Sequence, residues 1–459
     1  MNKKKFIMLV TLISVLICCS NSKKQTLDPE KIQKEKTQSE IVDFSSSNIF
    51  QGEKRNEVRR TDPTNPPVVL DVSGKIESKQ LKINSFYKNS YFIKLKHPQS
   101  NEGKNFKIIS NRYSAGKSSP STLTILTAGV PRVTFLSVVV YKNWILVGGL
   151  SGLFCYNKDG EYLYTLLECD EFKDIDVTKY LEINMNEVNQ VLCGFSVMDD
   201  ICAFVSDTQG KATLHFFDLN NGTEVHKKTI PIKSLYLLDG NHKTWLNYHY
   251  EVRAKKSLPY MCTLTANSDT ICRFYNKNIF TDMTGMSVFH NPGSPSIYNY
   301  RDKLFVRQQG NDTIYRFRSE YEINPIYVFK TGNYRATIQD IIKGNAKGKR
   351  SIDKIIETDK LLLFSLLGSD KILFYDKSMK KIYESDSNLL NSTTNILPST
   401  FDMIQGNEQK LYDVYTKQTL SNFMANEEEK RQYSAENIEF INKWKDEVGE
   451  GEILLMLLE

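Results

Sequence analysis

Ser268-Asp269-Thr270-Ile271-Cys272-Arg273 and Asn311-Asp312-Thr313-Ile314-Tyr315-Arg316 are two copies of one pattern, a polar turn that leads into a short strand. Ser369-Asp370-Lys371-Ile372 is a third, looser copy. Two further segments, Leu153–Asn157 and Leu214–Asp218, align on the same apolar position. A strand motif that returns about every 40–60 residues is typical of repeat architectures, among them the β-propeller.

Other strand candidates flank these motif strands and complete the repeat. The candidates that precede them are Trp144–Val147, Ile201–Val205, Met261–Leu264, Lys303–Val306 and Leu361–Phe364. Outer candidates follow several of them at Glu161–Leu167, Thr223–Ile230, Ile326–Phe329 and Lys381–Glu384. Turns such as Asn157–Gly160 and Asn220–Gly222 suit tight hairpins, because Asn, Asp and Gly tolerate positive φ. Four short antiparallel strands per unit is the make-up of a propeller blade.

The two ends of the body supply one more unit. Five units are visible along the chain, and a sixth can be assembled from Leu81–Phe86 and Tyr91–Lys96 with Lys410–Tyr415 and Glu452–Leu458. Closing the ring with strands from both termini removes the open sheet edges. We therefore expect an all-β fold, a six-bladed β-propeller closed by N- and C-terminal strands. A pair of β-sandwiches is the alternative, but it leaves the repeated motif unexplained.

One helix is expected near the C-terminus. Asn426 followed by three glutamates resembles a helix start with acidic residues at its positive end. Ile438, Ile441, Trp444 and Val448 then fall on one face, and Gly449 and Gly451 end the helix. Packing on the propeller explains this apolar face, with partner binding as the alternative.

The N-terminus has the features of an export signal. Three lysines at positions 3–5 precede an apolar run from Phe6 to Ile17, which is too short to span a bilayer. Leu16-Ile17-Cys18-Cys19 resembles a lipobox, with Cys18 as a departure just before the cleavage point. This predicts a signal peptide over residues 1–18 and lipidation of Cys19. An uncleaved membrane anchor or a buried strand is the alternative.

A polar segment separates this signal from the propeller. Residues 19–66 are rich in Lys, Glu, Gln, Ser and Asn and end in a Pro-rich stretch, so we expect a disordered tether, with the propeller domain over residues 67–459. No acidic cluster follows Cys19. In lipoproteins of gut Gram-negative anaerobes such a cluster favours surface display, so we expect the periplasmic face of the outer membrane.

The chain resembles the six-bladed β-propeller lipoproteins of unknown function from gut Gram-negative anaerobes. The resemblance rests on the lipobox, on Asn311–Arg316 followed by Asn324–Phe329, and on the terminal helix followed by an apolar strand. It covers roughly residues 68–459. These motifs are structural, so the resemblance implies a fold and a location and assigns no catalytic residue.

A few residues are candidates for metal binding or catalysis, but none of them forms a recognised motif. His242 and His249 are a candidate metal or base pair, although exposed loop histidines or satisfied core histidines explain them better. Asp170, Glu171, Asp174 and Asp176 are candidate calcium ligands without EF-hand spacing, and Lys343, Lys347, Lys349 and Arg350 form a basic loop. Catalytic and cofactor residues are therefore predicted as none, and metal ligands stay unknown.

The cysteines outside the signal indicate buried thiols. The six are Cys155, Cys169, Cys193, Cys202, Cys262 and Cys272, and they show no zinc-site spacing. Disulfides stay an alternative outside the cytoplasm. A two-residue hairpin at Asp199-Asp200 pairs Cys202 with residue 197, which disfavours a bridge between Cys193 and Cys202.

Charge narrows the classes of partner. The net charge of +6 includes the three signal lysines, so the mature chain carries +3, which gives no support for nucleic-acid binding. Two hypotheses follow. The first is a membrane-anchored, non-catalytic binding or scaffold module for a glycan, peptide or envelope protein. The second is a propeller hydrolase, lactonase or lyase with a metal or carboxylates in the central channel. The absence of a catalytic motif favours the first.

Overall fold

The structure is a computed structural model of the 459-residue chain. It describes most of the chain from Asn56 to Glu459, and all of the described residues belong to one compact unit. The described ranges are 56–82, 86–98, 137–149, 152–169, 190–208, 211–230, 236–237, 244–248, 259–265, 269–275, 296–308, 311–332, 352–366, 369, 371–386, 397–399, 405–407 and 410–459.

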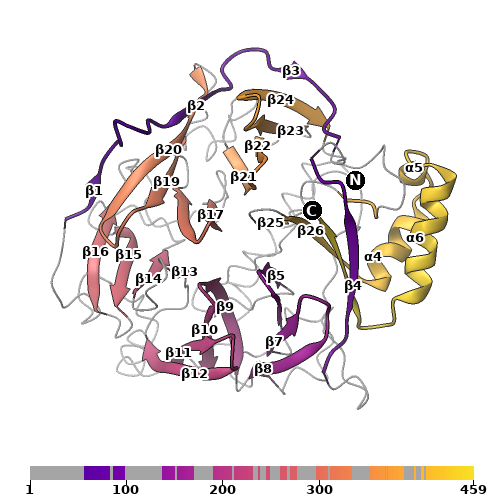
Figure 1. Ribbon diagram of the computed structural model, residues 1–459, viewed down its shortest axis with the longest axis horizontal. Helices are drawn as coiled ribbons and strands as arrows, with labels where there is room; N and C mark the ends of the chain where they lie inside the picture. Colours follow the sequence, from indigo (N-terminus) through magenta and orange to yellow (C-terminus); the bar gives the residue numbers. More distant parts are fainter. Residues whose placement is uncertain are drawn as a thin grey trace, which may run out of the picture. The chain divides into compact units, whose positions relative to one another are not determined.

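Five sheets are each built around four strands that are consecutive in sequence, and they stand around a common centre (Figure 1). The first is β5 (Ser137–Tyr141), β6 (Trp144–Gly149), β7 (Gly152–Asn157) and β8 (Tyr162–Glu168). The second is β9 (Val191–Met198), β10 (Ile201–Thr208), β11 (Lys211–Asp218) and β12 (Thr223–Ile230). The third is β13 (Tyr236–Leu237), β14 (Thr244–Tyr248), β15 (Pro259–Thr265) and β16 (Thr270–Tyr275).

The fourth and fifth sheets follow the same plan. The fourth contains β17 (Ser296–Tyr300), β18 (Lys303–Arg307), β19 (Thr313–Phe317) and β20 (Glu322–Lys330). The fifth contains β21 (Ile352–Glu357), β22 (Leu361–Leu366), β23 (Lys371–Asp376) and β24 (Lys381–Asp386). All of these consecutive strands pair antiparallel, as the repeat predicts. The all-β propeller is therefore confirmed.

The remaining sheet joins the two ends of the body. Its order is β25 (Gln405–Asn407), β26 (Lys410–Tyr415), β27 (Ile453–Leu458) and β4 (Ser90–Leu95). β27 is buried along its whole length and lies between β26 and β4. The prediction of six blades is therefore wrong: five blades consist of consecutive strands, and strands from the two ends of the body form a composite closing sheet.

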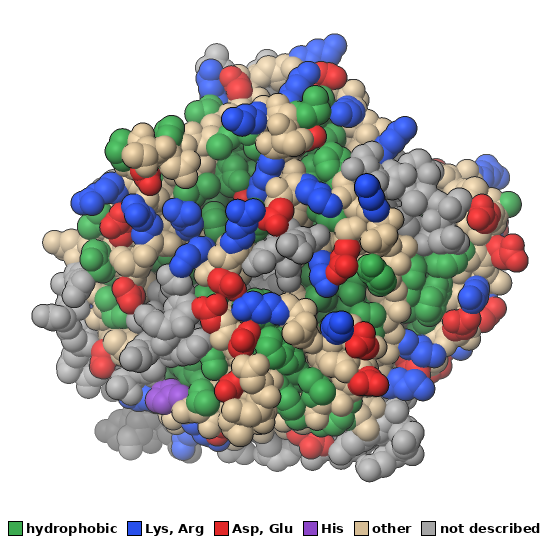
Figure 2. Space-filling view, viewed as in Figure 1, with side chains coloured by type: hydrophobic (Ala, Val, Ile, Leu, Met, Phe, Trp, Pro, Cys, Tyr) green, Lys and Arg blue, Asp and Glu red, His purple; other side chains and the backbone are tan. Residues whose placement is uncertain are grey.

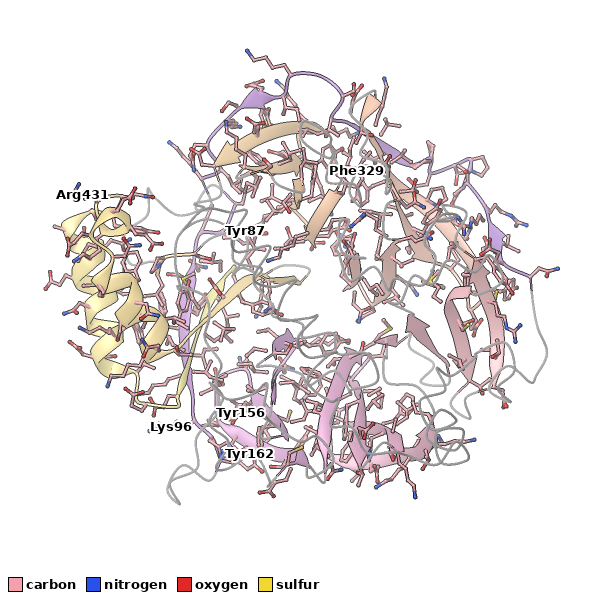
Figure 3. All side chains as sticks on the ribbon, turned by 180° about the vertical axis from the view of Figure 1, so that it is seen from behind. Tyr87, Lys96, Tyr156, Tyr162, Phe329 and Arg431 are labelled. Carbon is pink, nitrogen blue, oxygen red and sulfur yellow. The ribbon has the colours of Figure 1, made fainter. Side chains whose placement is uncertain are left out.

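The closing sheet is also tied to the first blade. The Tyr156 hydroxyl of β7 donates a hydrogen bond of 2.7 Å to the backbone carbonyl of Lys96, just after β4; both residues are labelled in Figure 3. The Tyr412 hydroxyl of β26 reaches the Val138 carbonyl of β5 at 3.3 Å. Tyr162 lies against Tyr156 on the outer side, with ring centroids 5.9 Å apart. The first two contacts link the closing sheet to the first blade.

The N-terminal segment departs from the prediction. Leu81 and Lys82, the described start of the strand expected over Leu81–Phe86, are not strand residues. Instead β1 (Val58–Arg59) and β2 (Val68–Asp71) pair in parallel with β20, and β3 (Glu77–Ser78) pairs in parallel with β24. This segment, which we call the edge strap, begins inside the range assigned to the tether. It covers the outer edges of two blades, which would otherwise expose unpaired backbone groups.

Two helices stand where one was expected, and a third precedes them. They are α4 (Lys417–Ala425), α5 (Glu427–Lys430) and α6 (Ala435–Glu447). Asn426 caps α5 as predicted, since its side chain accepts from the Glu429 amide at 3.3 Å. The helix ends after one turn, and Ser434 caps a new helix by accepting from the Asn437 amide at 3.2 Å. The predicted apolar face belongs to α6, where Trp444 stacks on Phe92 of β4 at 5.2 Å.

Apolar side chains fill the spaces between neighbouring sheets. Phe329, Phe364 and Leu373 belong to a buried cluster shared by the fourth and fifth blades, and the rings of Phe329 (labelled in Figure 3) and Phe364 are 4.9 Å apart. Leu411, Leu454 and Ile441 belong to another cluster, which joins the closing sheet to α6. Large buried aliphatic and aromatic side chains dominate such interfaces because they remove the most apolar surface from water.

Candidate functional site at the hairpin tips

Tight turns follow the first strand of several blades, and these turns form the candidate site. Backbone φ is positive at Lys142 (48°), at Asp199 and Asp200 (46° and 65°), and at Arg301 and Asp302 (51° and 52°). Two successive residues with positive φ are the mark of the turn that matches the twist of a hairpin. Polar residues occupy these positions because Asp in particular tolerates this backbone region.

The tips of four blades are linked by charged side chains. Lys142 Nζ lies 3.3 Å from Asp200 Oδ1 and 3.9 Å from Asp302 Oδ2. Arg301, in the same turn as Asp302, pairs with Asp359 Oδ1 at 2.9 Å. We call these five residues the tip network. In Figure 2, acidic and basic side chains lie beside one another near the middle of the face shown.

The tip network reaches blades that are not neighbours in the ring. Tyr141, on the first blade, donates a 2.7 Å hydrogen bond to Asp302 on the fourth, and its hydroxyl accepts from the Asp199 amide at 2.7 Å. Asn299 of the fourth blade donates to the Val197 carbonyl of the second at 3.0 Å. The innermost hairpins therefore converge toward the centre of the ring.

A buried carboxylate lies next to the tip network. Glu357, at the end of β21, is 3% exposed and accepts hydrogen bonds of 2.7 Å from Tyr298, Tyr327 and Lys377. Lys377 also lies 4.3 Å from the ring centroid of Tyr300. We call Glu357 with its three donors the Glu357 clasp. It locks the fourth blade to the fifth because its donors come from both.

Burial dominates the electrostatics of these residues. It raises the pKa of the Tyr298 and Tyr327 hydroxyls well above the usual value, with Glu357 acting in the same direction. Burial also lowers the pKa of Lys377, although Glu357 opposes that change.

Each carboxylate of this region binds a Lys, Arg or Tyr side chain; these carboxylates are Asp200, Asp302, Asp359 and Glu357. Such an arrangement suits binding and blade-to-blade locking, because the carboxylates are neutralised by their partners.

Most residues singled out from the sequence lie outside the described ranges. This holds for Cys19 and for the candidate histidine pair, His242 and His249. It also holds for the candidate calcium ligands, Asp170, Glu171, Asp174 and Asp176, and for the basic loop of Lys343, Lys347, Lys349 and Arg350. Among the described residues, no group of His, Cys, Asp and Glu has the arrangement of a metal site. Those assignments remain predictions.

The described histidines lie in or against the core. His97 is 5% exposed and packs edge to face on Phe154, with ring centroids 4.8 Å apart. His226 packs on Phe216 at 5.7 Å. His215 is also buried, but both of its ring nitrogens have polar side-chain partners.

The cysteine interpretation holds for the described side chains. Cys155, Cys169, Cys202, Cys262 and Cys272 are buried thiols that form no disulfide. Burial raises the pKa of Cys155 to about 11 and that of Cys262 to about 12, so these thiols stay protonated at neutral pH. Cys202 pairs with Val197 across the Asp199-Asp200 turn, as the two-residue hairpin predicted.

Sequence reasoning missed the tip network, although a signal for it exists. Lys142-Asn143, Asp199-Asp200, Arg301-Asp302 and Asp359-Lys360 are polar pairs placed directly before a buried second strand. The Asp199-Asp200 turn was recognised as a hairpin, but the innermost strands of the other blades were not, so the other three pairs had no place in the predicted blade. Aligning the repeat on its first strand would have revealed them.

The ring of sheets with a charged network at its hairpin tips defines the class, a β-propeller protein. Within that class, the chain belongs to the family described as "Domain of unknown function (DUF4933)", whose model matches residues 50–449. The match begins inside the range that composition assigned to the tether. It includes the edge strap and most of the closing sheet.

One solved structure supports the fold. A protein of Bacteroides fragilis described as a "Putative exported protein" has a TM-score of 0.51 at 14% identity, over 85% of this chain and 98% of that one. Proteins of unknown function from Bacteroides thetaiotaomicron and Bacteroides caccae have TM-scores of 0.33 and 0.30, at 9% and 10% identity. They cover 71% and 54% of this chain, and 70% and 80% of their own lengths. No curated protein matches the chain.

Proposed function

We propose that this protein is a membrane-anchored envelope lipoprotein whose propeller acts as a binding or scaffold module for a glycan, peptide or envelope protein. The observation that carries the binding role is the tip network. It gathers charges of both signs from four blades onto one face, together with the ring and hydroxyl of Tyr141.

The mixed charge of the tip network favours a particular kind of ligand. Lys142 and Arg301 are 44% and 66% exposed at their side chains, while Asp200 and Asp302 beside them are 37% and 35% exposed. Such partly exposed ion pairs contribute little to stability, so their partners can be exchanged for groups on a ligand. A peptide or protein surface that carries both signs is the best match.

The alternative function, a hydrolase, lactonase or lyase with central carboxylates, has less support. Such an enzyme needs carboxylates that are available to a metal or a substrate. Among the described residues, Glu357 is buried and already accepts hydrogen bonds from Tyr298, Tyr327 and Lys377.

The binding role is tested by co-purification from native membranes with a tip variant. We expect Lys142→Ala/Arg301→Ala to lose at least about tenfold of the partner retained by the wild type, which corresponds to about 1.4 kcal/mol. Lys211→Ala/Lys228→Ala, on the second blade away from the tips, is the matched control and retains the partner. Equal retention by both double variants contradicts the proposed surface.

Location is proposed on separate grounds. We propose export, followed by anchoring to the periplasmic face of the outer membrane. Three observations support this location: the lipobox-like Leu16–Cys19, the long polar segment after Cys19, and the description of the Bacteroides fragilis protein as a "Putative exported protein". Within the described part of the chain, no helix has the length and hydropathy needed to cross a membrane.

Cys19→Ala is expected to move the protein from the membrane to the soluble fraction. The lipid supplies the anchor in this proposal, since acyl chains on one cysteine bind a bilayer far more firmly than a polar segment does. Fractionation with metabolic palmitate labelling checks it. Cys18→Ala is the control and keeps the label. Palmitate that persists in Cys19→Ala contradicts the assignment.

A further inference from the structure

The second blade contains a serine, a histidine and a glutamate in one hydrogen-bonded row across three strands. Ser206 Oγ on β10 lies 2.9 Å from His215 Nε2 on β11, and His215 Nδ1 lies 2.5 Å from Glu224 Oε1 on β12. An ionised carboxylate only accepts hydrogen bonds, so Nδ1 carries the proton that it donates to Glu224. Nε2 is then the acceptor for the Ser206 hydroxyl. This order of groups activates serine in acyl transfer.

A bulge in the sheet places the glutamate in this row. Phe216 pairs with His226 while Phe217 pairs with Glu224, so Val225 is an extra residue. Regular pairing would place Val225 opposite Phe217, and the bulge places Glu224 there instead, on the face that carries His215. β-Bulges re-aim side chains in this way and are over-represented next to active sites.

A second irregularity lies at the serine. Val205 pairs with Gly194, but Ser206 pairs with Leu192, so the pairing of β9 with β10 shifts between Val205 and Ser206. The pairing of β10 with β11 is regular, with Phe204 opposite His215, so Ser206 lies on the same face as His215 without this shift.

The surroundings favour a neutral imidazole. The Phe204 ring stacks on the His215 ring with centroids 4.5 Å apart and an interplanar angle of 10°. Burial lowers the pKa of His215, and the Glu224 carboxylate only partly offsets this. A neutral histidine bonded to a serine hydroxyl is the state that a general base requires. Ser206 is 1% exposed, whereas the Glu224 side chain is 33% exposed, so the row runs from the interior toward the surface.

Other buried serines of this protein have different partners. Ser385 Oγ accepts from the Leu81 amide at 2.8 Å, and Ser399 donates to Asp413 at 2.8 Å. Neither of these bonds includes a histidine. Ser385 is therefore a matched control for a serine that is buried in a blade but not activated.

We propose that Ser206 is a nucleophile activated by His215, and that the second blade carries an acyl-transfer site for small ester substrates. Ser206 Oγ bonds to the ester carbonyl carbon as its proton passes to His215 Nε2. The ester C–O bond then breaks, and the leaving alcohol takes that proton. Water cleaves the resulting acyl-serine by the same route and releases the carboxylic acid. Glu224 is a positioning residue, which holds the imidazole through Nδ1. The proposal goes beyond the binding function and does not depend on it.

The full-length protein is treated with diisopropyl fluorophosphate, a small reagent that forms a serine O–P bond as its P–F bond breaks. Peptide mass mapping is expected to find the adduct on Ser206 and not on Ser385. Ser206→Ala loses the adduct. His215→Gln slows labelling at least about 100-fold, the usual contribution of a general base. Thermal unfolding of each variant establishes that it is folded.

A pH profile distinguishes positioning from a structural role of Glu224. The labelling rate of the wild type should rise with pH as His215 loses its proton. Because Glu224 raises the pKa of His215, Glu224→Gln should move the midpoint of this rise to lower pH and reduce the plateau. Absence of an adduct on Ser206 in the folded wild type overturns the proposal. Equal labelling rates in the wild type and a folded His215→Gln variant overturn it as well. Binding of a partner at the tip network is unaffected by either result.

Discussion

Leu455→Asp is expected to abolish the folded state. Leu455 is fully buried in β27, where it pairs with Val414 of β26 and Ile93 of β4, so the new carboxylate would have no water and no cation. An uncompensated buried charge costs about 3–5 kcal/mol, a large share of the 5–15 kcal/mol that stabilises a typical native protein. Cooperative thermal unfolding, followed by circular dichroism, should disappear or shift down by about 5 °C.

Leu163→Asp is the matched control for that experiment. Leu163 lies on β8 and is 42% exposed, so the same substitution leaves its charge in water. Its effect should stay within about 0.5 kcal/mol. If Leu455→Asp unfolds at the wild-type temperature, β27 does not occupy the middle of the closing sheet.

Glu357→Ala is expected to destabilise the protein by about 3–5 kcal/mol, the usual result of removing one partner of a buried ion pair. The substitution leaves the Lys377 ammonium and the hydroxyls of Tyr298 and Tyr327 without their shared acceptor, between two blades. Denaturant unfolding with an unchanged m-value measures this loss.

Glu384→Ala provides the comparison within the same blade. Glu384 pairs with Lys371 at 2.9 Å, but both side chains are partly exposed to water, at 33% and 42%, whereas Glu357 is buried. A surface pair of this kind contributes at most about 1 kcal/mol. Similar losses in the two variants would show that the Glu357 clasp is no stronger than an ordinary surface ion pair.

The repeat predicted the outer three strands of most blades because their side chains follow a regular pattern. Ile314 and Ile372, for example, mark strands whose partners and hairpin turns follow from the spacing alone. The innermost strands were missed. Ser137–Tyr141 is short and has three valines in a row, so its apolar residues do not alternate clearly.

The edge strap could not be predicted from side-chain pattern. β1 and β3 are two residues long, and they attach to β20 and β24 through backbone groups. Backbone pairing at a sheet edge requires no particular side chains. The polar composition of this segment therefore gave no sign of the strands in it. The break between α5 and α6 was also missed, because Ser434 begins a new helix inside a stretch whose pattern predicts a single helix.

The row of Ser206, His215 and Glu224 was likewise beyond sequence reasoning. In a regular register Glu224 would lie on the opposite face of the sheet from His215, and only the bulge at Val225 brings the two together. The tip network had a partial signal in its polar turn pairs. Its contacts across the ring, such as Tyr141 with Asp302, depend on the closed arrangement of the blades.

The most direct test of that closed arrangement is a disulfide between the two ends of the body. Tyr91 of β4 lies directly opposite Leu457 of β27, a position at which Cβ atoms are about 4.5–5.5 Å apart. In Tyr91→Cys/Leu457→Cys, mild oxidation of the folded protein should link residues 91 and 457 within one chain, as found by peptide mass mapping. Tyr91→Cys/Leu163→Cys, which combines β4 with the first blade, should remain reduced. Failure of the 91–457 link to form in a folded protein would contradict closure of the propeller by strands from both termini.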